Sequence, residues 1–186
     1  MQLHTYFNQI LAEVTSTLSE IDELAAQALI DNILNAERIF VAGSGRSGLI
    51  MRGFAMRLMH LGFGAHVVGY VTTPAIRAGD LLIIGSASGA TASLRTFAQT
   101  AQQQGARLAL ITAANKSPLA NMAEQVLVIS APTPKADSLS HTASVQPMAS
   151  LFEQTMLVLL DTLSLLIMDQ LNLDDANAFL RHANLE

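Results

Sequence analysis

The stretch VAGSGRSG, residues 41–48, ends a short apolar run and opens a polar turn that is rich in glycine. Three glycines match the pattern G-x-G-x-x-G, namely Gly43, Gly45 and Gly48. This pattern is typical of a strand-to-helix turn that binds a dinucleotide phosphate. The turn also contains donors that the pattern does not require, namely Ser44, Arg46 and Ser47. It therefore predicts an α/β fold, and it leaves open which phosphate is bound.

The same order of apolar run, turn and helical segment repeats along the chain. Five runs rich in Val, Ile and Leu are expected to be strands: 39–42, 65–68, 81–84, 108–111 and 126–129. Uninterrupted apolar strands that alternate with helices indicate a parallel sheet covered on both faces. The expected fold is a three-layer α/β/α sandwich with a five-stranded parallel sheet of order 2-1-3-4-5, a flavodoxin-like arrangement.

Helices are expected before, between and after these strands. An early helix is expected to begin at Ser19 as N-cap, with Asp22 as a weaker capping-box partner. Further helices are expected from the glycine turn to about 61, across 93–103, near 118–123, and from Pro147 onward. The chain is expected to form one domain over 1–186, with N-terminal helices in 1–36, an α/β core in 38–130 and C-terminal helices in 147–182.

Two polar loops are expected to meet at one edge of this sheet. In the 2-1-3-4-5 order, strands one and three are neighbours, and a crevice opens at their carboxyl ends. The turn 43–48 follows the first strand, and GSASGAT, residues 85–91, follows the third. The hydroxyls of the loop 85–91 and the N–H groups of the helix that follows it suit a phosphate, although Ser and Thr are also common helix caps. The hydroxyls belong to Ser86, Ser88 and Thr91.

The charge distribution favours a small anion as ligand. The formal net charge of -5 disfavours nucleic acid as a partner. Within this acidic chain, residues 38–79 contain five arginines and no acidic residue. A local basic field inside an acidic protein attracts a small anion and repels a long polyanion. For Arg52 and Arg57 the alternative is a solvated helix face.

Composition excludes several other classes of protein. The chain contains no Cys, which excludes disulfides, thiol nucleophiles and Cys-ligated zinc or iron–sulfur clusters. The most apolar run, 156–168, contains Asp161 and is shorter than the roughly 20 residues of a membrane span, so no membrane association is expected. The first residues show no secretion signal, and we therefore expect a cytoplasmic protein.

A dinucleotide site makes a further demand that this sequence does not meet. An acidic residue about 20 residues after the glycines should bind the ribose hydroxyls. The first acidic residue after the turn is Asp80, at the start of the third expected strand. The sequence therefore favours a sugar phosphate over a dinucleotide.

Several segments together resemble the sugar isomerase (SIS) domain family. They are VAGSGRSG (41–48), FAMRLMHLGF (54–63), TTPAIRAGDLLIIGSASGAT (72–91), SVQPMASLFEQ (144–154) and RHANLE (181–186). The resemblance covers the chain from about Arg38 to the end and is greatest for the hexulose-phosphate isomerases of the family. It implies reversible conversion of D-arabino-hex-3-ulose 6-phosphate to D-fructose 6-phosphate in the ribulose monophosphate pathway, without metal or redox cofactor.

Moving a carbonyl between adjacent carbons requires a base, an enediolate intermediate and donors that stabilise its oxygen charge. Glu153 lies in the segment that resembles the family's catalytic glutamate segment, and a solvated helix glutamate is the alternative. Arg46 is expected to hold the phosphate or an enediolate oxygen. The residues expected to bind phosphate or sugar hydroxyls are Ser44, Gly45, Ser47, Ser86, Ser88 and Thr91.

Two histidines have open roles. His60 lies in a last helical turn before Gly62, where it complements the helix dipole or, as the resemblance implies, reaches the sugar for ring opening or proton transfer. His182 either closes the site of its own or a neighbouring subunit or lies in a disordered terminus. The remaining histidines, which are His4, His66 and His141, show no metal-ligand spacing, and no metal site is expected.

The sequence departs from the family pattern in the second loop, which in the family usually reads S-G-S-G-E-T. Here Ala87 replaces a glycine and Ala90 replaces a glutamate, and Ala149 also stands where a glycine is usual. These changes leave two alternatives open: a non-catalytic sugar-phosphate-binding module and an isomerase of another phosphosugar.

The apolar composition predicts association between subunits. Hydrophobic residues make up 51% of the chain and charged residues 13%. The last long helix is apolar nearly all round over 157–168, and such a helix must be covered on more than one side. We therefore expect a homo-oligomer, and the resemblance implies a homotetramer with active sites near subunit boundaries.

Overall fold

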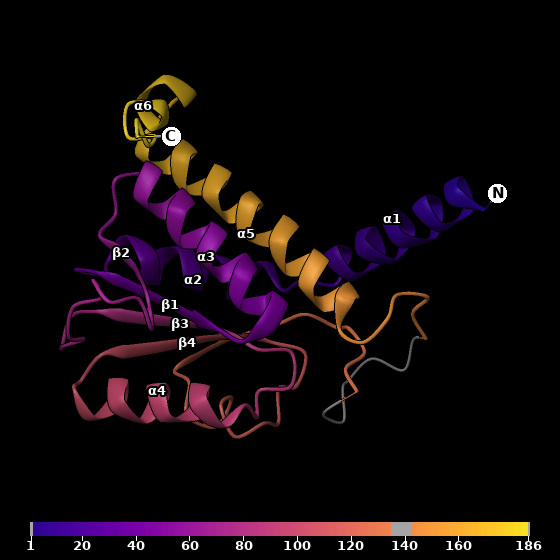
Figure 1. The fold of residues 1–186 in the computed structure, drawn as a ribbon, viewed down its shortest axis with the longest axis horizontal. Helices are drawn as coiled ribbons and strands as arrows, with labels where there is room; N and C mark the ends of the chain where they lie inside the picture. Colours follow the sequence, from indigo (N-terminus) through magenta and orange to yellow (C-terminus); the bar gives the residue numbers. More distant parts are fainter. Residues whose placement is uncertain (1, 135–142, 186) are drawn as a thin grey trace.

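The computed structural model describes residues 2–134 and 143–185. Its five strands form one parallel sheet of order β2-β1-β3-β4-β5, which confirms the expected fold (Figure 1). The elements in chain order are α1 (Leu3–Ser19), α2 (Glu23–Leu34), β1 (Ile39–Gly43), α3 (Gly45–His60), β2 (Ala65–Val67), β3 (Leu81–Gly85), α4 (Ala92–Gln103), β4 (Arg107–Thr112), β5 (Gln125–Val128), α5 (Ser150–Leu171) and α6 (Asp175–Phe179).

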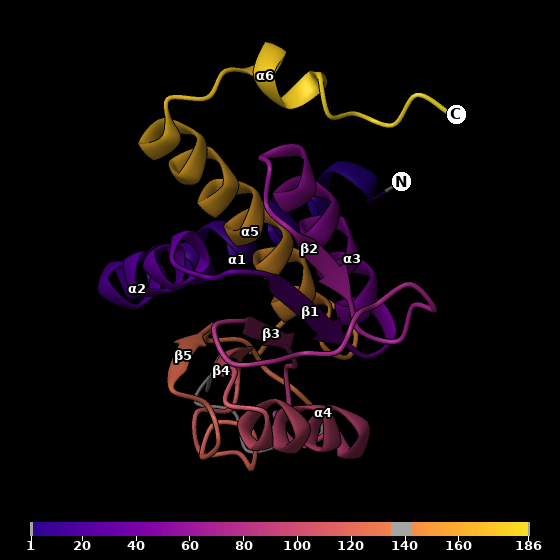
Figure 2. The same cartoon turned by 90° about the vertical axis from the view of Figure 1, so that its left-hand side faces the viewer.

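The strands have apolar side chains on both faces because both faces are covered. Figure 2 shows α2, α3 and α5 on one side of the sheet and α4 on the other. In β1, Ile39 and Val41 join the core under the first group of helices, whereas Phe40 and Ala42 join the core under α4. This alternation explains why the sequence of each central strand is uniformly apolar.

Helix α1 extends away from this body. In Figure 1 only its later part approaches the sheet domain, where it packs against the beginning of α5. The side chains of its free part are exposed, among them the apolar Tyr6, Phe7 and Leu11. The N-terminal helix is therefore tied to the domain through α5.

Two expected helix starts and one expected helix are wrong. Ser19 is the last residue of α1, and α2 is instead capped by Asp22, whose carboxylate accepts from the N–H of Leu24 at 2.9 Å. The segment 118–123 forms turns instead of a helix, and the Leu119 N–H donates to the carbonyl of Gly89 at 3.0 Å. The expected start at Pro147 is also too early, since Met148 has φ 55 and α5 begins at Ser150.

Helix α5 meets the length and composition of a membrane span, which the sequence run 156–168 alone did not. It has 22 residues, and an 18-residue window within it has a mean hydropathy of 1.6. Half of that window is buried inside the fold, where the helix packs against α3, α1 and α2. Core helices of soluble proteins pass the same test, and this packing identifies α5 as a core helix.

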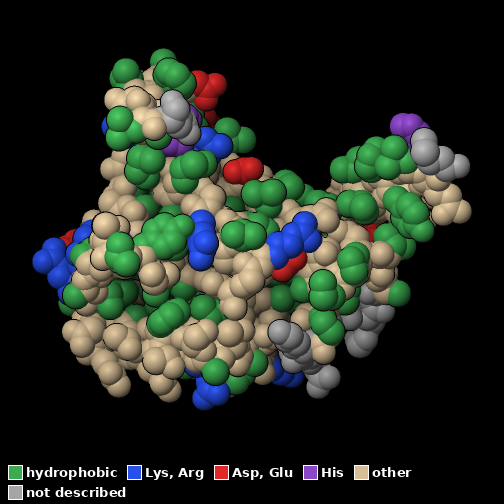
Figure 3. All heavy atoms as spheres, viewed as in Figure 1, with side chains coloured by type: hydrophobic (Ala, Val, Ile, Leu, Met, Phe, Trp, Pro, Cys, Tyr) green, Lys and Arg blue, Asp and Glu red, His purple; other side chains and the backbone are tan. Residues whose placement is uncertain are grey.

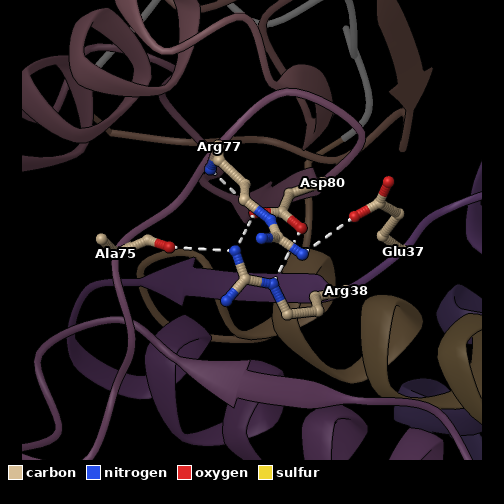
Figure 4. A network of polar contacts seen from close by, with 5 residues as sticks. All are labelled: Glu37, Arg38, Ala75, Arg77 and Asp80. Carbon is tan, nitrogen blue, oxygen red and sulfur yellow. Dashed lines mark hydrogen bonds and ion pairs between the residues drawn. The ribbon is translucent and has the colours of Figure 1, made fainter.

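A buried ion pair joins the amino ends of β1 and β3 (Figure 4). Arg38 donates to both carboxylate oxygens of Asp80, at 3.0 and 2.6 Å, and Asp80 is fully buried. The carboxylate also accepts from the Arg77 N–H at 2.8 Å, and Arg38 donates to the carbonyl of Ala75 at 3.0 Å. The pair therefore fixes the connection that leads into β3.

The environment of Asp80 keeps it ionised. Burial alone would raise the pKa of its carboxyl group, but the hydrogen bonds from Arg38 and from the Arg77 N–H, together with both positive charges, outweigh burial. The pKa of Asp80 therefore lies below its ordinary value.

Asp80→Asn is expected to lower the free energy of unfolding at neutral pH by about 2–3 kcal/mol, because it removes a buried charge that accepts charged hydrogen bonds. The contribution is complete above the unfolded-state pKa of about 3.9 and is lost as the pH falls through the lower folded-state pKa. Urea denaturation as a function of pH measures it. A difference from wild type that stayed constant down to about pH 2 would contradict this role. Glu37→Gln, which breaks the exposed pair with Arg77, is the control.

Candidate active site

The first turn of α3 lies directly against the end of β1. A Cβ atom on Gly48 would lie 2.6 Å from the carbonyl oxygen of Gly43, and one on Gly43 would lie 2.8 Å from the Cα of Gly48. Gly45 has φ +58, a left-handed conformation that side chains disfavour. The glycines therefore allow a close approach of helix and strand that directs the N–H groups of the α3 terminus into the space beyond the sheet.

The loop after β3 forms the facing wall. The Ser86 N–H donates to the carbonyl of Ile111 at 2.9 Å, and the carbonyl of Ala87 accepts from Thr112 Oγ1 at 3.2 Å. Both contacts tie the loop to β4. Ser86 and Ser88 are buried, and Thr91 is the N-cap residue of α4. The hydroxyls are thus held on a rigid turn at a helix N-terminus.

The first turn of α5 brings a carboxylate to α3. Arg46 Nη1 lies 3.3 Å from Glu153 Oε2, and Ser47 Oγ donates to Glu153 Oε1 at 3.5 Å. Arg46 also donates to Ser150 Oγ at 3.0 Å. The side chain of Glu153 is 14% exposed and that of Arg46 is 50% exposed. The carboxylate is therefore largely shielded from solvent, whereas the guanidinium is half exposed and faces both the carboxylate and solvent.

These three segments enclose a cavity of about 420 Å³, which is within the size range of small-molecule sites. Its lining residues are Ser44, Gly45, Arg46, Ser47, Gly85, Ser86, Ala87, Ser88, Thr91, Leu94, Thr133, Pro134, Met148, Ala149, Ser150 and Glu153. The two loops thus face each other across the β1–β3 switch point, as expected from the sheet order.

The structure brings together the eight expected residues of the α3, α4 and α5 termini: Ser44, Gly45, Arg46, Ser47, Ser86, Ser88, Thr91 and Glu153. Glu153 lies in the first turn of α5. Ser150 was missed by the sequence analysis, although its position three residues before Glu153 places both on one helix face. What each residue does remains a prediction.

The two histidines lie elsewhere in this chain. His60 ends α3, at the opposite end from the cavity, and its ring stacks on that of His182 with centroids 5.3 Å apart. Both line a second cavity beside α6, together with Arg57 and Asp175. Within one chain they are therefore remote from Glu153, and the expected roles of His60 and His182 at the sugar would need a neighbouring subunit. Across residues 2–134 and 143–185, no cluster of three or more potential metal ligands occurs.

The architecture matches a known family. A model of the SIS domain matches residues 32–160. The chain belongs to the SIS domain family. Two curated relatives are both 3-hexulose-6-phosphate isomerases. The relative from Bacillus subtilis (strain 168) is 43% identical over 187 residues, and the match covers 100% of both chains. The relative from Mycobacterium gastri is 44% identical over 174 residues, and the match covers 94% of this chain and 86% of that chain.

Solved structures show the same fold in this family. The hypothetical protein from Methanococcus jannaschii, whose structure infers a molecular function of 3-hexulose-6-phosphate isomerase, superposes with a TM-score of 0.85 at 34% identity. The match covers 98% of this chain and 99% of that chain. The SIS fold of this chain is thus shared over its whole length.

Gly48→Ala is expected to lower the free energy of unfolding by about 1–3 kcal/mol and to weaken binding of inorganic phosphate, because the new methyl group pushes α3 away from β1. Gly53→Ala is the matched control. It lies on the exposed face of the same helix with open space around it, and it should stabilise the protein by up to about 1 kcal/mol. Urea denaturation and calorimetric titration measure both effects. Equal stability of the two variants would contradict the close-approach argument.

Proposed function

We propose that this protein catalyses the reversible conversion of D-arabino-hex-3-ulose 6-phosphate to D-fructose 6-phosphate. The observation that carries the proposal is the Glu153 carboxylate, held between Arg46 and Ser47 in a cavity whose other wall carries buried hydroxyls. The curated relatives named 3-hexulose-6-phosphate isomerase support the same substrate class. The proposed setting of the reaction is the ribulose monophosphate pathway.

The chemistry needs a proton to leave C2 of the hexulose phosphate and a proton to be added at C3. Glu153 takes the C2 proton, which gives a 2,3-enediolate. It then returns a proton to C3 while the hydroxyl proton passes from O2 to O3, so that the carbonyl lies at C2. As the substrate enters, Arg46 turns from the carboxylate toward the negative oxygen of the enediolate or toward the phosphate. This movement frees Glu153 to act as a base and stabilises the charge that develops.

The phosphate is proposed to lie against the loop after β3. Ser86, Ser88 and Thr91 supply hydroxyl donors there, and α4 directs its N-terminal N–H groups and dipole toward the same space. Ala87 packs into the apolar core while it also lines the cavity, so its methyl group is accommodated by the fold. Holding the phosphate at a distance from the base keeps C2 and C3 in register with it.

Glu153→Gln is expected to lower kcat about a thousandfold while binding of fructose 6-phosphate is retained, because the amide cannot take a proton from carbon. Asp161→Asn, an exposed change on the same helix, is the control and should have wild-type activity. The substrate is generated enzymatically from formaldehyde and ribulose 5-phosphate. Fructose 6-phosphate is then followed through glucose 6-phosphate and NADP reduction.

Two other outcomes of this assay define the competing functions. A wild-type protein that binds fructose 6-phosphate without turnover would be a sugar-phosphate-binding module. A protein that turns over heptose or arabinose phosphates faster than the hexulose phosphate would be an isomerase of another phosphosugar. A panel of these substrates therefore separates the three functions.

The proposed assembly is a homotetramer. Apolar side chains gather on the projecting α1 in Figure 3. Further exposed apolar side chains lie along α5, namely Leu157, Val158, Leu165 and Leu166. Groups of exposed apolar side chains on projecting or surface helices are typical of association surfaces.

Phe7→Glu is expected to reduce the mass of the assembly, because it places a charge in the middle of the exposed apolar surface of α1. Gln9→Glu adds the same charge to an exposed polar position of the same helix and should leave the mass unchanged. Light scattering after size-exclusion chromatography measures the mass. A wild-type mass equal to the 19.8 kDa of one chain would contradict the proposed assembly.

A further inference from the structure

A carboxylate on α1 holds the chain segment that leads into α5. Glu13 Oε2 accepts from Ser144 Oγ at 2.7 Å and from Gln146 Nε2 at 2.9 Å. Its Oε1 accepts from the Val145 N–H at 2.8 Å. Three consecutive residues, which we call the strap 144–146, therefore donate to one side chain more than 130 residues away in the sequence.

The negative charge of Glu13 strengthens the hydrogen bonds that hold the strap. Burial alone would raise the pKa of Glu13, but the Val145 N–H and the donors of Ser144 and Gln146 outweigh burial and hold the pKa below its ordinary value. Hydrogen bonds to an ionised acceptor are roughly twice as strong as those between neutral groups. Within residues 2–134 and 143–185, no basic side chain forms an ion pair with Glu13, so the strap supplies the donors that balance its charge.

The strap leads directly into the cavity wall. Met148 follows it with φ 55, a left-handed conformation that costs a side-chain-bearing residue about 1–2 kcal/mol and persists only where neighbouring contacts hold it. The Ser150 N–H donates to the carbonyl of Pro147 at 3.1 Å, and the Glu153 N–H donates to the carbonyl of Ala149 at 3.0 Å. The direction in which α5 starts, and with it the position of the Glu153 carboxylate, depends on these residues.

We propose that Glu13 is a positioning residue for the reaction: by binding the strap 144–146 it fixes the first turn of α5 and holds Glu153 against Arg46 and the substrate. This inference rests on the proposed isomerase function. Glu13 lies outside the cavity, and it acts through the strap alone. The phosphate wall belongs to β3 and α4 and does not depend on it.

The test compares Glu13→Ala with Glu20→Ala, the same change at an exposed glutamate that caps α1 and makes no side-chain hydrogen bond within the described residues. Glu13→Ala is expected to lower kcat about tenfold or more, because misplacing a reacting group by a fraction of an ångström slows proton transfer. The Kd for inorganic phosphate should stay within about twofold of wild type, and Glu20→Ala should equal wild type in both. A purely structural role of Glu13 would instead change phosphate binding and kcat together.

Hydrogen exchange provides a readout that is independent of turnover. The Val145 amide should exchange at least about tenfold faster in Glu13→Ala than in wild type, whereas amides in β3 should not change. Gln146→Ala is the second variant. If Glu13 acts through the strap, the double variant should lose less kcat than the product of the two single losses.

The possible failures are distinguishable. An active wild type together with an equally active Glu13→Ala, or unchanged exchange at Val145, would overturn the positioning role alone. An inactive wild type would overturn the proposed isomerase function, and with it the role of Glu13 in positioning Glu153 for that reaction. Proportional loss of kcat and phosphate affinity in Glu13→Ala would also overturn the positioning role.

Discussion

The close approach of α3 to the end of β1 is the contact on which the rest of the site depends. Gly43 and Gly48 meet backbone to backbone, at a distance that leaves no room for a side chain on either residue. Because the helix begins so near the strand, Arg46 and Ser47 stand at the carboxyl edge of the sheet, where the loop after β3 also ends. Two polar loops that are separate in the sequence thereby become opposite walls of one cavity.

Two ion pairs of similar chemistry lie at opposite edges of the sheet and have different physical consequences. The Arg38–Asp80 pair at the amino edge has a carboxylate that is 0% exposed and saturated with donors, so it fixes the fold. The Arg46–Glu153 pair at the carboxyl edge has a half-exposed guanidinium and a longer N–O separation of 3.3 Å. Such a pair costs little to open, which suits a base that must be released when a substrate enters.

Helix α5 connects the core, the site and the surface of the molecule. Its buried face includes Phe152, Leu160 and Ile167, and its first turn presents Glu153 to the cavity. Other apolar side chains of the helix, among them Leu157 and Leu165, are exposed. Helix α1 packs on the same end of α5 and binds the strap before it through Glu13. Helix α1, which extends from the domain and carries exposed apolar side chains, is thus linked through Glu13 and the strap to the first turn of α5, which carries Glu153.

The sequence by itself determined the layers, the strand order and the two loops. Runs such as 39–42 and 81–84 are apolar without interruption, as expected for strands of a sheet covered on both faces, and turn residues such as Gly43 and Ser86 mark where those strands end. Local signals of this kind are read over a few residues, so they are visible without tertiary structure. The expected site residues near these turns fell into one cavity for the same reason.

Tertiary structure alone decided the start of α5, the turns at 118–123 and the partners of each charge. Met148 adopts a positive φ directly after the strap that Glu13 of a distant helix holds, and the Leu119 N–H donates to the carbonyl of Gly89 in the loop after β3. The pairing of Arg46 with Glu153 and the distance of His60 from both depend on how helices pack. These features arise between segments at least 30 residues apart in the sequence or from the length of a packed helix, and no local pattern records them.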